Sequence, residues 1–95
     1  MMAAYLIGHI TVKDPELWER YVEGVGKSFE PYKAEIVFRG KRSKVLAGKH
    51  THENTVVIQF SDQEILQDWY YSKEYQELIP IRDKAAAVDI ICFDA

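Results

Sequence analysis

Apolar residues gather in four short segments that are rich in β-branched and aromatic side chains, a composition typical of β-strands. The segments cover residues 5–12, 35–40, 55–60 and 88–93. A shorter apolar run at 45–48 follows a polar turn at 41–44, and we expect it to resume or bend the second strand. The polar residues 49–54 predict a loop before the third strand. The pattern therefore predicts a sheet of four strands.

Two stretches between these strands show the three- and four-residue apolar spacing of amphipathic helices. In the first, Asp14 predicts an N-cap, Pro15 the first helical position and Pro31 the end of the helix. In the second, Ser61 predicts an N-cap, because Glu64 stands three positions further on as in a capping box.

The second helical stretch contains two further signals. Ser72 predicts a second cap, from which the helix restarts and runs to Ala86. Pro80 lies inside that run and predicts a kink, since proline has no amide hydrogen to donate. The resulting order β-α-β-β-α-β is that of the ferredoxin-like fold, an α+β sandwich in which helices cover one face of a four-stranded antiparallel sheet.

The predicted strands carry apolar residues on both faces of this sheet. Alternation assigns to one face Leu6, Ile10, Val12, Ile36, Phe38, Val56, Ile58, Phe60, Ile91 and Phe93. It assigns to the other face Tyr5, Ile7, Val37, Val57, Val88, Ile90 and Cys92, interrupted by His9, Thr11, Arg39, Thr55 and Gln59. A bulge in any strand would exchange part of these two sets.

The second apolar face predicts a partner. An antiparallel sheet with one solvated face alternates more cleanly with polar residues than this one does. Burial of each extra apolar side chain is worth about 1.5–3 kcal/mol, and two short helices cover only one face. We therefore expect a homodimer in which the second faces of two copies meet.

Composition narrows the class of protein. A chain of 95 residues has the length of one domain, which we expect to span residues 1–95, and its 47% apolar and 28% charged residues argue against disorder. The net charge of -3 and the lack of a long basic run argue against nucleic acid as a partner. No apolar stretch approaches the ~20 residues that would span a membrane.

Cysteine usage and the first residues bear on the compartment. Cys92 is the only cysteine, so an intrachain disulfide cannot form and a reducing compartment is expected. The opening residues 1–5 have neither a basic region nor a long apolar region, so we expect no signal peptide and a cytoplasmic protein.

Several segments together resemble a known family. They are the strand opening at Tyr5, the helix with Asp14, Trp18 and Tyr21, residues 37–40, 45–48, 56–60, 69–72 and 74–76, and Arg82. The chain resembles DUF1330, a family of small bacterial proteins of unknown function in the dimeric α/β barrel superfamily. The aromatic–Ser–x–Glu–Tyr–Gln segment is the most specific part of the match. One position departs from the family pattern, since Ala47 stands where members usually carry a glutamate before the glycine at Gly48.

The resemblance implies a ferredoxin-like fold and a dimer whose sheets face each other, and it implies no activity. Related families include cofactor-free monooxygenases, lactone isomerases, haem-degrading enzymes and stress-induced barrel proteins. That relation is one of fold, and a fold does not determine a function.

Five candidate ligand-binding residues fall on the helices, where they could line a cleft between the helices and the sheet. They are Tyr21, Tyr70, Ser72, Tyr75 and Arg82. Phenols and a guanidinium in a cleft would orient a small polar or aromatic molecule. Structural roles are the alternative: capping explains Ser72, packing explains Tyr75, and Arg82 could form an ion pair with Asp14 or Glu16.

Two further candidates interrupt the apolar strands. His9 could act as a general base, because an imidazole titrates near neutral pH, or it could be a hydrogen-bonded histidine at the dimer interface. Arg39 could bind a carboxylate or phosphate, or it could pair with Glu35, Asp89 or an acidic residue of the partner.

The remaining chemistry-bearing residues suggest little. His50, His52 and Glu53 form a local polar cluster, but no third and fourth ligand stand at a spacing typical of a metal site, so we expect no metal. Cys92 alternates with Ile90 and is expected to be a small core residue. We find no glycine-rich phosphate loop, no Ser-His-Asp set and no paired catalytic carboxylates, and we expect no cofactor.

Two classes of function remain open at this stage. The first is a module that binds a small organic molecule without chemistry, in the cleft between helices and sheet. The second is a cofactor-free enzyme, similar to a monooxygenase or an isomerase, that acts on a small aromatic or lactone substrate. In the enzyme, His9 or a tyrosine would accept a proton and Arg39 or Arg82 would hold an anion. The site could lie under the helices or between the paired sheets.

Overall fold

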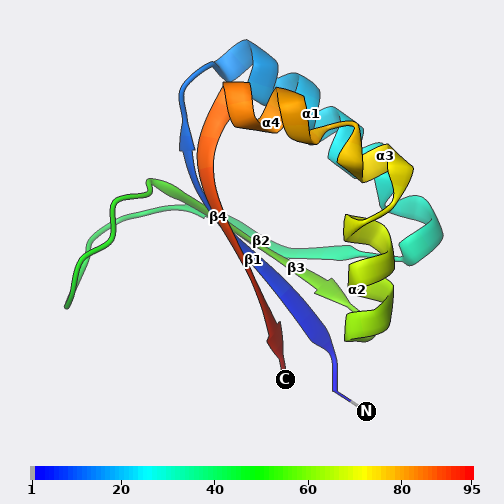
Figure 1. Ribbon diagram of the computed structural model, residues 1–95. Helices are drawn as coiled ribbons and strands as arrows, with labels where there is room; N and C mark the ends of the chain where they lie inside the picture. Colours follow the sequence, from blue (N-terminus) through cyan, green and yellow to red (C-terminus); the bar gives the residue numbers. More distant parts are fainter. Residues whose placement is uncertain (1) are drawn as a thin grey trace.

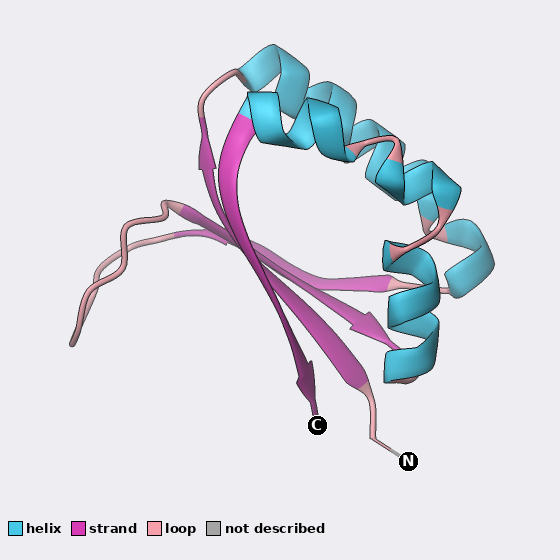
Figure 2. Ribbon diagram, viewed as in Figure 1, coloured by secondary structure: helices cyan, strands magenta, loops and turns pink. Residues whose placement is uncertain are grey.

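The computed structural model describes residues 2–95 and shows the element order that the sequence predicts (Figure 1). The strands are β1 (Ala4–Val12), β2 (Glu35–Lys41), β3 (Asn54–Phe60) and β4 (Ala86–Asp94). The helices are α1 (Pro15–Ser28), α2 (Gln63–Tyr70), α3 (Lys73–Gln76) and α4 (Ile79–Ala85), with a short 3-10 helix at Glu30–Tyr32. One antiparallel sheet has the order β2-β3-β1-β4, and the helices arch over one of its faces (Figure 2). The α+β, ferredoxin-like architecture is therefore confirmed.

The helix starts follow from local polar groups. Asp14 caps α1, since its Oδ1 accepts the Leu17 amide at 3.2 Å. The predicted cap at Ser61 is wrong by one residue: Asp62 caps α2, and its Oδ1 accepts the Ile65 amide at 2.8 Å. The carboxylate of Asp62 can accept the same kind of backbone hydrogen bond as the hydroxyl of Ser61, so the residue types alone did not show which of the two is the N-cap.

Residues 72–86 contain two short helices in place of the single kinked helix that the sequence predicts. Ser72 is confirmed as a cap, since its Oγ accepts the Tyr75 amide at 3.2 Å. The first short helix ends at Gln76, and Pro80 lies in the first turn of α4. A missing amide hydrogen costs nothing in a first turn, so Pro80 begins a helix and does not bend one.

The predicted strand at 45–48 does not form. Residues 42–53 make a long loop that projects from the sheet (Figure 1). Its base is held by Arg42, whose amide donates to the Glu53 carbonyl and whose Nη1 donates to the carbonyls of His50 and His52 at 2.9 and 3.2 Å. Gly48 has a φ of +82°, which glycine adopts without strain.

A β-bulge in β2 changes which side chains face the helices. Ile36 pairs with Ile58 and Phe38 pairs with Val57, so Val37 is the extra residue. Directly paired residues share a face, and Ile58 is buried under the helices. Beyond the bulge, Phe38 therefore points away from the helices and Arg39 points toward them, the reverse of the predicted assignment.

The predicted faces of β4 are also reversed. Leu6 pairs with Cys92, Gly8 with Ile90 and Ile10 with Val88, so these residues of β4 share the helix side of the sheet with the buried Leu6. Cys92 is exposed near the end of this edge strand, which corrects the expectation of a buried core residue. Apolar residues stand at almost every position of β4, so alternation could not fix its phase.

The sheet face turned away from the helices, called the outer face below, is apolar. Its large apolar side chains are Tyr5, Ile7, Phe38, Val57, Ile91 and Phe93. Phe38 is 52% exposed, Phe93 47% and Ile91 44%. Phe38 lies on the edge strand β2, whereas Ile91 and Phe93 lie on the opposite edge strand β4, so exposed apolar side chains extend across the whole width of the sheet, as is typical of an interaction surface. Within residues 2–95, no helix has the length and apolar character needed to cross a membrane.

Two glycines of α1 give a matched test of its packing. A Cβ at Gly26 would meet no atom within 4 Å, whereas a Cβ at Gly24 would lie 2.6 Å from Leu78 Cδ2. Gly26→Ala should raise the free energy of unfolding by about 0.5–1 kcal/mol, because alanine restricts the unfolded chain and favours helix. Gly24→Ala should give no such gain, because Leu78 must move. Urea denaturation of both variants measures the difference; equal stabilisation would contradict the close approach of α1 to Leu78.

Candidate functional site

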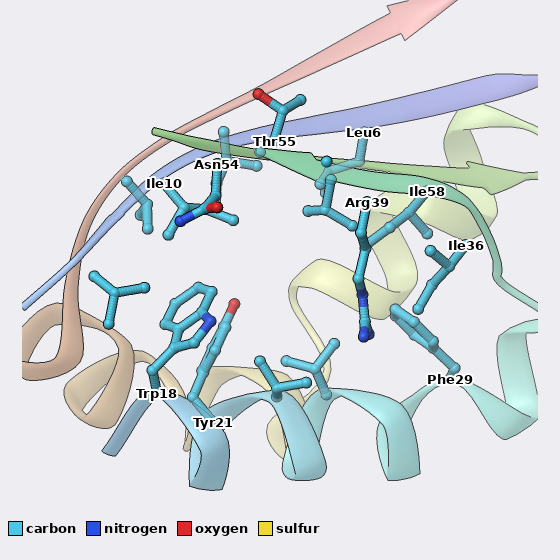
Figure 3. Close-up of a pocket in the computed structure, with 18 of the residues that line it drawn as sticks. Leu6, Ile10, Trp18, Tyr21, Phe29, Ile36, Arg39, Asn54, Thr55 and Ile58 are labelled. Atoms are coloured by element: carbon cyan, nitrogen blue, oxygen red, sulfur yellow. The ribbon is translucent and has the colours of Figure 1, made fainter. Parts of the chain in front are cut away.

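A cavity of about 500 Å³ lies between α1 and the sheet (Figure 3). Its walls are mostly apolar, and they come from β1, β2, β3, β4 and one side of α1. Among the apolar lining residues are Leu6, Ile10, Val22, Val25, Phe29, Ile36, Val56, Ile58 and Ile90. A volume of this size accommodates a small organic molecule.

A few polar side chains enter this apolar space. Trp18 and Tyr21 rise side by side from α1, with ring centroids 4.9 Å apart, and the Tyr21 hydroxyl points toward the sheet (Figure 3). Arg39 extends from β2 toward α1 and ends beside the cavity (Figure 3). Lys41 and Asn54 line the same end of β2 and β3.

The charge of the cavity lining is positive. Arg39 makes no side-chain hydrogen bond or ion pair within residues 2–95, so the predicted alternative of pairing with Glu35 or Asp89 does not occur in one chain. No carboxylate lies among the described lining residues, which include the cations Arg39 and Lys41. The arrangement can hold an anion with an apolar body.

A hydrogen-bonded group of tyrosines and Arg82 closes the cavity at its helical end. The hydroxyls of Tyr21 and Tyr75 lie 2.7 Å apart. Arg82 Nη1 donates to Tyr75 Oη at 3.1 Å and to Tyr70 Oη at 3.3 Å. Since Tyr75 accepts from Arg82, it is free to donate to Tyr21, and Tyr21 in turn can donate a hydrogen bond into the cavity.

The protonation states of Tyr21, Tyr75 and Arg82 allow each of them to donate a hydrogen bond. Burial raises the pKa of both Tyr21 and Tyr75, so neither phenol ionises near neutral pH. Burial by itself would lower the pKa of Arg82, but its hydrogen bonds to Tyr70 and Tyr75 leave that pKa raised, so the guanidinium stays charged. Tyr21 is therefore a neutral hydrogen-bond donor and a poor proton acceptor.

The structure separates the five helical candidates. Tyr21 and Tyr75 line the cavity, whereas Tyr70 and Arg82 lie outside its lining, where Arg82 donates to the hydroxyls of Tyr75 and Tyr70. Ser72 caps α3 and donates to the Trp69 carbonyl at 2.7 Å, so its structural explanation is sufficient. Arg82 forms its ion pair with Asp83, at 3.1 Å, and not with Asp14 or Glu16 as predicted.

His9 lies on the other side of the sheet from this cavity. It pairs with Thr55 across β1 and β3, and its Nδ1 is 3.1 Å from Thr55 Oγ1. Figure 3 shows Thr55 pointing away from the cavity, which places His9 on the outer face as well. The histidine therefore cannot exchange a proton directly with a molecule held beside Tyr21.

The remaining titratable side chains concern a possible metal cluster and the thiol of Cys92. Among residues 2–95, no group of three or more His, Cys, Asp or Glu side chains is arranged to hold a metal ion. Burial, with the nearby Asp94, raises the pKa of the Cys92 thiol and so disfavours the reactive thiolate.

Sequence reasoning missed three residues that line the cavity with polar atoms: Trp18, Lys41 and Asn54. Trp18 could have been found, because it shares a helical face with Tyr21. Lys41 and Asn54 are paired neighbours on β2 and β3, which only the register of the bulged strand reveals.

Comparisons with known proteins agree with this fold. The family described as "Domain of unknown function (DUF1330)" matches residues 3–95. No curated protein sequence matches the chain. A protein of unknown function from Rhodopseudomonas palustris, RPA0582, superposes with a TM-score of 0.83 at 14% identity, covering 99% of this chain and 82% of that one.

Two other solved structures are similar at the level of fold. SnoaB, a cofactor-independent oxygenase from Streptomyces nogalater, gives a TM-score of 0.69 at 12% identity, covering 100% of this chain and 94% of that one. A dimeric ferredoxin-like protein of unknown function from Jannaschia sp. CCS1 gives 0.69 at 9% identity, covering 98% and 99%. At these identities the likeness concerns the fold, and the chemistry of the site has to be argued from its own residues.

Proposed function

Because the chain belongs to the DUF1330 family, whose function is unknown, we propose a function from its own geometry: the cavity under α1 binds a small organic anion with an apolar body. The observation that carries this proposal is the pairing of an apolar cavity of about 500 Å³ with cations that no carboxylate of the described lining neutralises. Arg39 would hold the anionic group, and Tyr21 would donate a hydrogen bond to a polar atom of the same ligand.

The tyrosine group supports selectivity for a hydrogen-bond acceptor. Tyr21 is almost fully buried, and its hydroxyl reaches Tyr75 and, through it, the charged Arg82. A ligand with an acceptor can receive the Tyr21 O–H, whereas a ligand without one leaves that hydroxyl paired with Tyr75 alone and forgoes a hydrogen bond worth about 0.5–1.5 kcal/mol. We therefore expect carboxylates, or phenols next to a carbonyl, in preference to hydrocarbons.

We also propose that two copies associate through the outer face. Its apolar side chains are exposed in the single chain, and a second copy offers a surface of the same shape and chemistry related by a twofold axis. The Jannaschia protein of the same fold is described as dimeric, which supports this arrangement without fixing its details.

A cofactor-free enzyme is the second candidate, and the likeness to a cofactor-independent oxygenase favours it. The same cavity would hold the substrate anion, with Arg39 and Tyr21 stabilising negative charge that develops on it. The described lining provides donors and no carboxylate or imidazole to accept a proton, so binding is the function that this cavity supports more directly.

The binding proposal predicts a dependence on Arg39. Arg39→Ala should weaken the affinity for an aromatic carboxylate by about tenfold to a hundredfold, because a charge-assisted hydrogen bond contributes roughly 1.5–3 kcal/mol. A thermal-shift screen of aryl and alkyl carboxylic acids, each paired with its neutral amide, identifies the ligand, and calorimetry then measures Kd. Wild-type protein should prefer the acid over the amide.

Arg20→Ala is the matched control, since Arg20 is an exposed arginine of α1 outside the cavity lining. It should leave the dissociation constant unchanged. Equal affinities of the two variants, or of acid and amide, would count against an anion site at Arg39.

A further inference from the structure

A second group of titratable side chains lies on the outer face, where β1, β4 and the base of the projecting loop meet, beside the apolar residues through which we propose that two copies associate. The ring centroid of His9 lies 4.8 Å from that of His50 and 6.5 Å from that of His52. Lys49 and Asp89 line the same shallow hollow. The three histidines of the chain thus form one cluster, although His9 and His52 are 43 positions apart in the sequence.

His52 and His9 differ in how many of their ring nitrogens form hydrogen bonds. Both nitrogens of His52 are engaged: Nε2 is 2.7 Å from Asp89 Oδ2, to which it donates, and Nδ1 is 2.9 Å from Thr11 Oγ1. His52 is therefore fixed in place. His9 is held through Nδ1 alone, by Thr55 Oγ1, and its Nε2 makes no hydrogen bond within residues 2–95. This is the nitrogen that can exchange a proton with a bound molecule.

We propose that this hollow is a second site, distinct from the cavity under α1, in which His9 Nε2 transfers protons to and from a small, polar hydroxycarbonyl compound. In the forward step the C–H bond next to the carbonyl breaks, an Nε2–H bond forms, and the electron pair moves onto the carbonyl oxygen as an enolate. Lys49 and His50, on the wall of the hollow, stabilise that oxygen. If the proton returns to the same carbon, that C–H exchanges with solvent. If it returns to the former carbonyl carbon, the hydroxyl proton moves to the enolate oxygen and the new carbonyl forms at the neighbouring carbon, so the substrate isomerises without an oxidant.

The surrounding charges favour a neutral His9. Burial, together with the neighbouring His50 and His52, lowers its pKa below the ordinary value for histidine, and Asp89 opposes the shift. The other charges at this place are Lys49 and Arg42, which holds the backbone of the loop. Because the unprotonated imidazole is the base, the rate should rise with pH, and the midpoint of that rise should lie below the ordinary histidine pKa.

Deuterium exchange tests the proposal. Hydroxyacetone, dihydroxyacetone and glyceraldehyde are incubated with the protein in D2O, and deuterium at the carbon beside the carbonyl is followed by NMR. These probes are neutral, so they do not compete for the anion-binding cavity. The wild-type protein should accelerate exchange, and His9→Gln should lower that acceleration by about 100-fold or more. Asp89→Asn should move the pH profile to lower pH, because it removes the group that opposes the pKa shift.

Asp94→Asn is the matched control: it removes another exposed carboxylate of β4 outside the hollow and should leave the rate and pH profile unchanged. Exchange that is no faster with wild-type protein than with buffer, or that persists in His9→Gln, would overturn the proposal. Carboxylate binding measured on His9→Gln separates the two sites, since it should remain intact if the cavity proposal is correct.

Discussion

Replacing Trp69 with alanine should lower the free energy of unfolding by about 3–5 kcal/mol, the cost typical of truncating a large buried aromatic residue. Trp69 is 2% exposed and packs against Tyr75, Phe29 and Phe60, with ring centroids 4.4, 5.4 and 5.4 Å away. Its Nε1–H donates to Ser28 Oγ at 2.8 Å. The substitution therefore leaves a cavity and also removes one of the two hydrogen bonds of the buried Ser28 hydroxyl, which still donates to the Val25 carbonyl.

Chemical denaturation followed by circular dichroism measures this loss, with Tyr71→Ala as the control. Tyr71 lies two positions after Trp69 in the sequence and is 68% exposed. Truncating it to alanine should therefore change the free energy of unfolding by less than about 0.5 kcal/mol. Similar losses in the two variants would mean that the aromatic cluster around Trp69 does not hold the helices to the sheet. Because domains are stable by only about 5–15 kcal/mol, Trp69→Ala should also be prone to unfold near body temperature.

Phe38→Asp should convert the proposed dimer into a monomer. Phe38 is 52% exposed on the outer face, directly beside Val57, and a twofold interface would place a carboxylate from each copy within the apolar contact. Burying an unpaired charge costs several kcal/mol per copy, which corresponds to more than about a thousandfold loss of affinity. Light scattering should show about twice 11.0 kDa for the wild-type protein and one chain mass for the variant.

Tyr71→Asp places the same charge on an exposed aromatic residue of the helical side and should leave the dimer intact. Wild-type protein that scatters as a single chain would refute the proposed interface. A Phe38→Asp variant that remains dimeric would place the contact elsewhere on the surface.

The order of elements could be predicted from the sequence because its signals are local. The four longer apolar runs, a capping aspartate at 14 and a capping serine at 72 act within a few residues of the chain and were identified correctly, whereas the shorter apolar run at 45–48 lies in a loop. The phase of the strands could not be predicted, because it depends on pairing across the sheet. One extra residue at Val37 places Phe38 on the outer face and Arg39 on the helix side of the sheet. No local pattern in the sequence of β2 predicts this bulge.

The candidate site, too, could be predicted from the sequence only where its contacts are local in the chain. Tyr75 and Arg82 stand seven residues apart, a helical spacing that predicts neighbours, and the structure joins them by a hydrogen bond although a helix break lies between. The contact between His52 and Asp89 joins a loop to β4 across 37 positions, and the sequence contains no pattern for it. Contacts between distant strands and loops require the topology, which is why the histidine cluster emerged only from the structure.

The bulge in β2 also affects how the protein avoids aggregation. β2 lies at one edge of the sheet, where unpaired backbone groups would template a strand from another molecule. The extra residue at Val37 interrupts the regular spacing of those groups, and the charges of Glu35, Arg39 and Lys41 surround it. An incoming strand would meet an irregular, charged edge, so we expect copies to associate through sheet faces and not to grow into extended fibres.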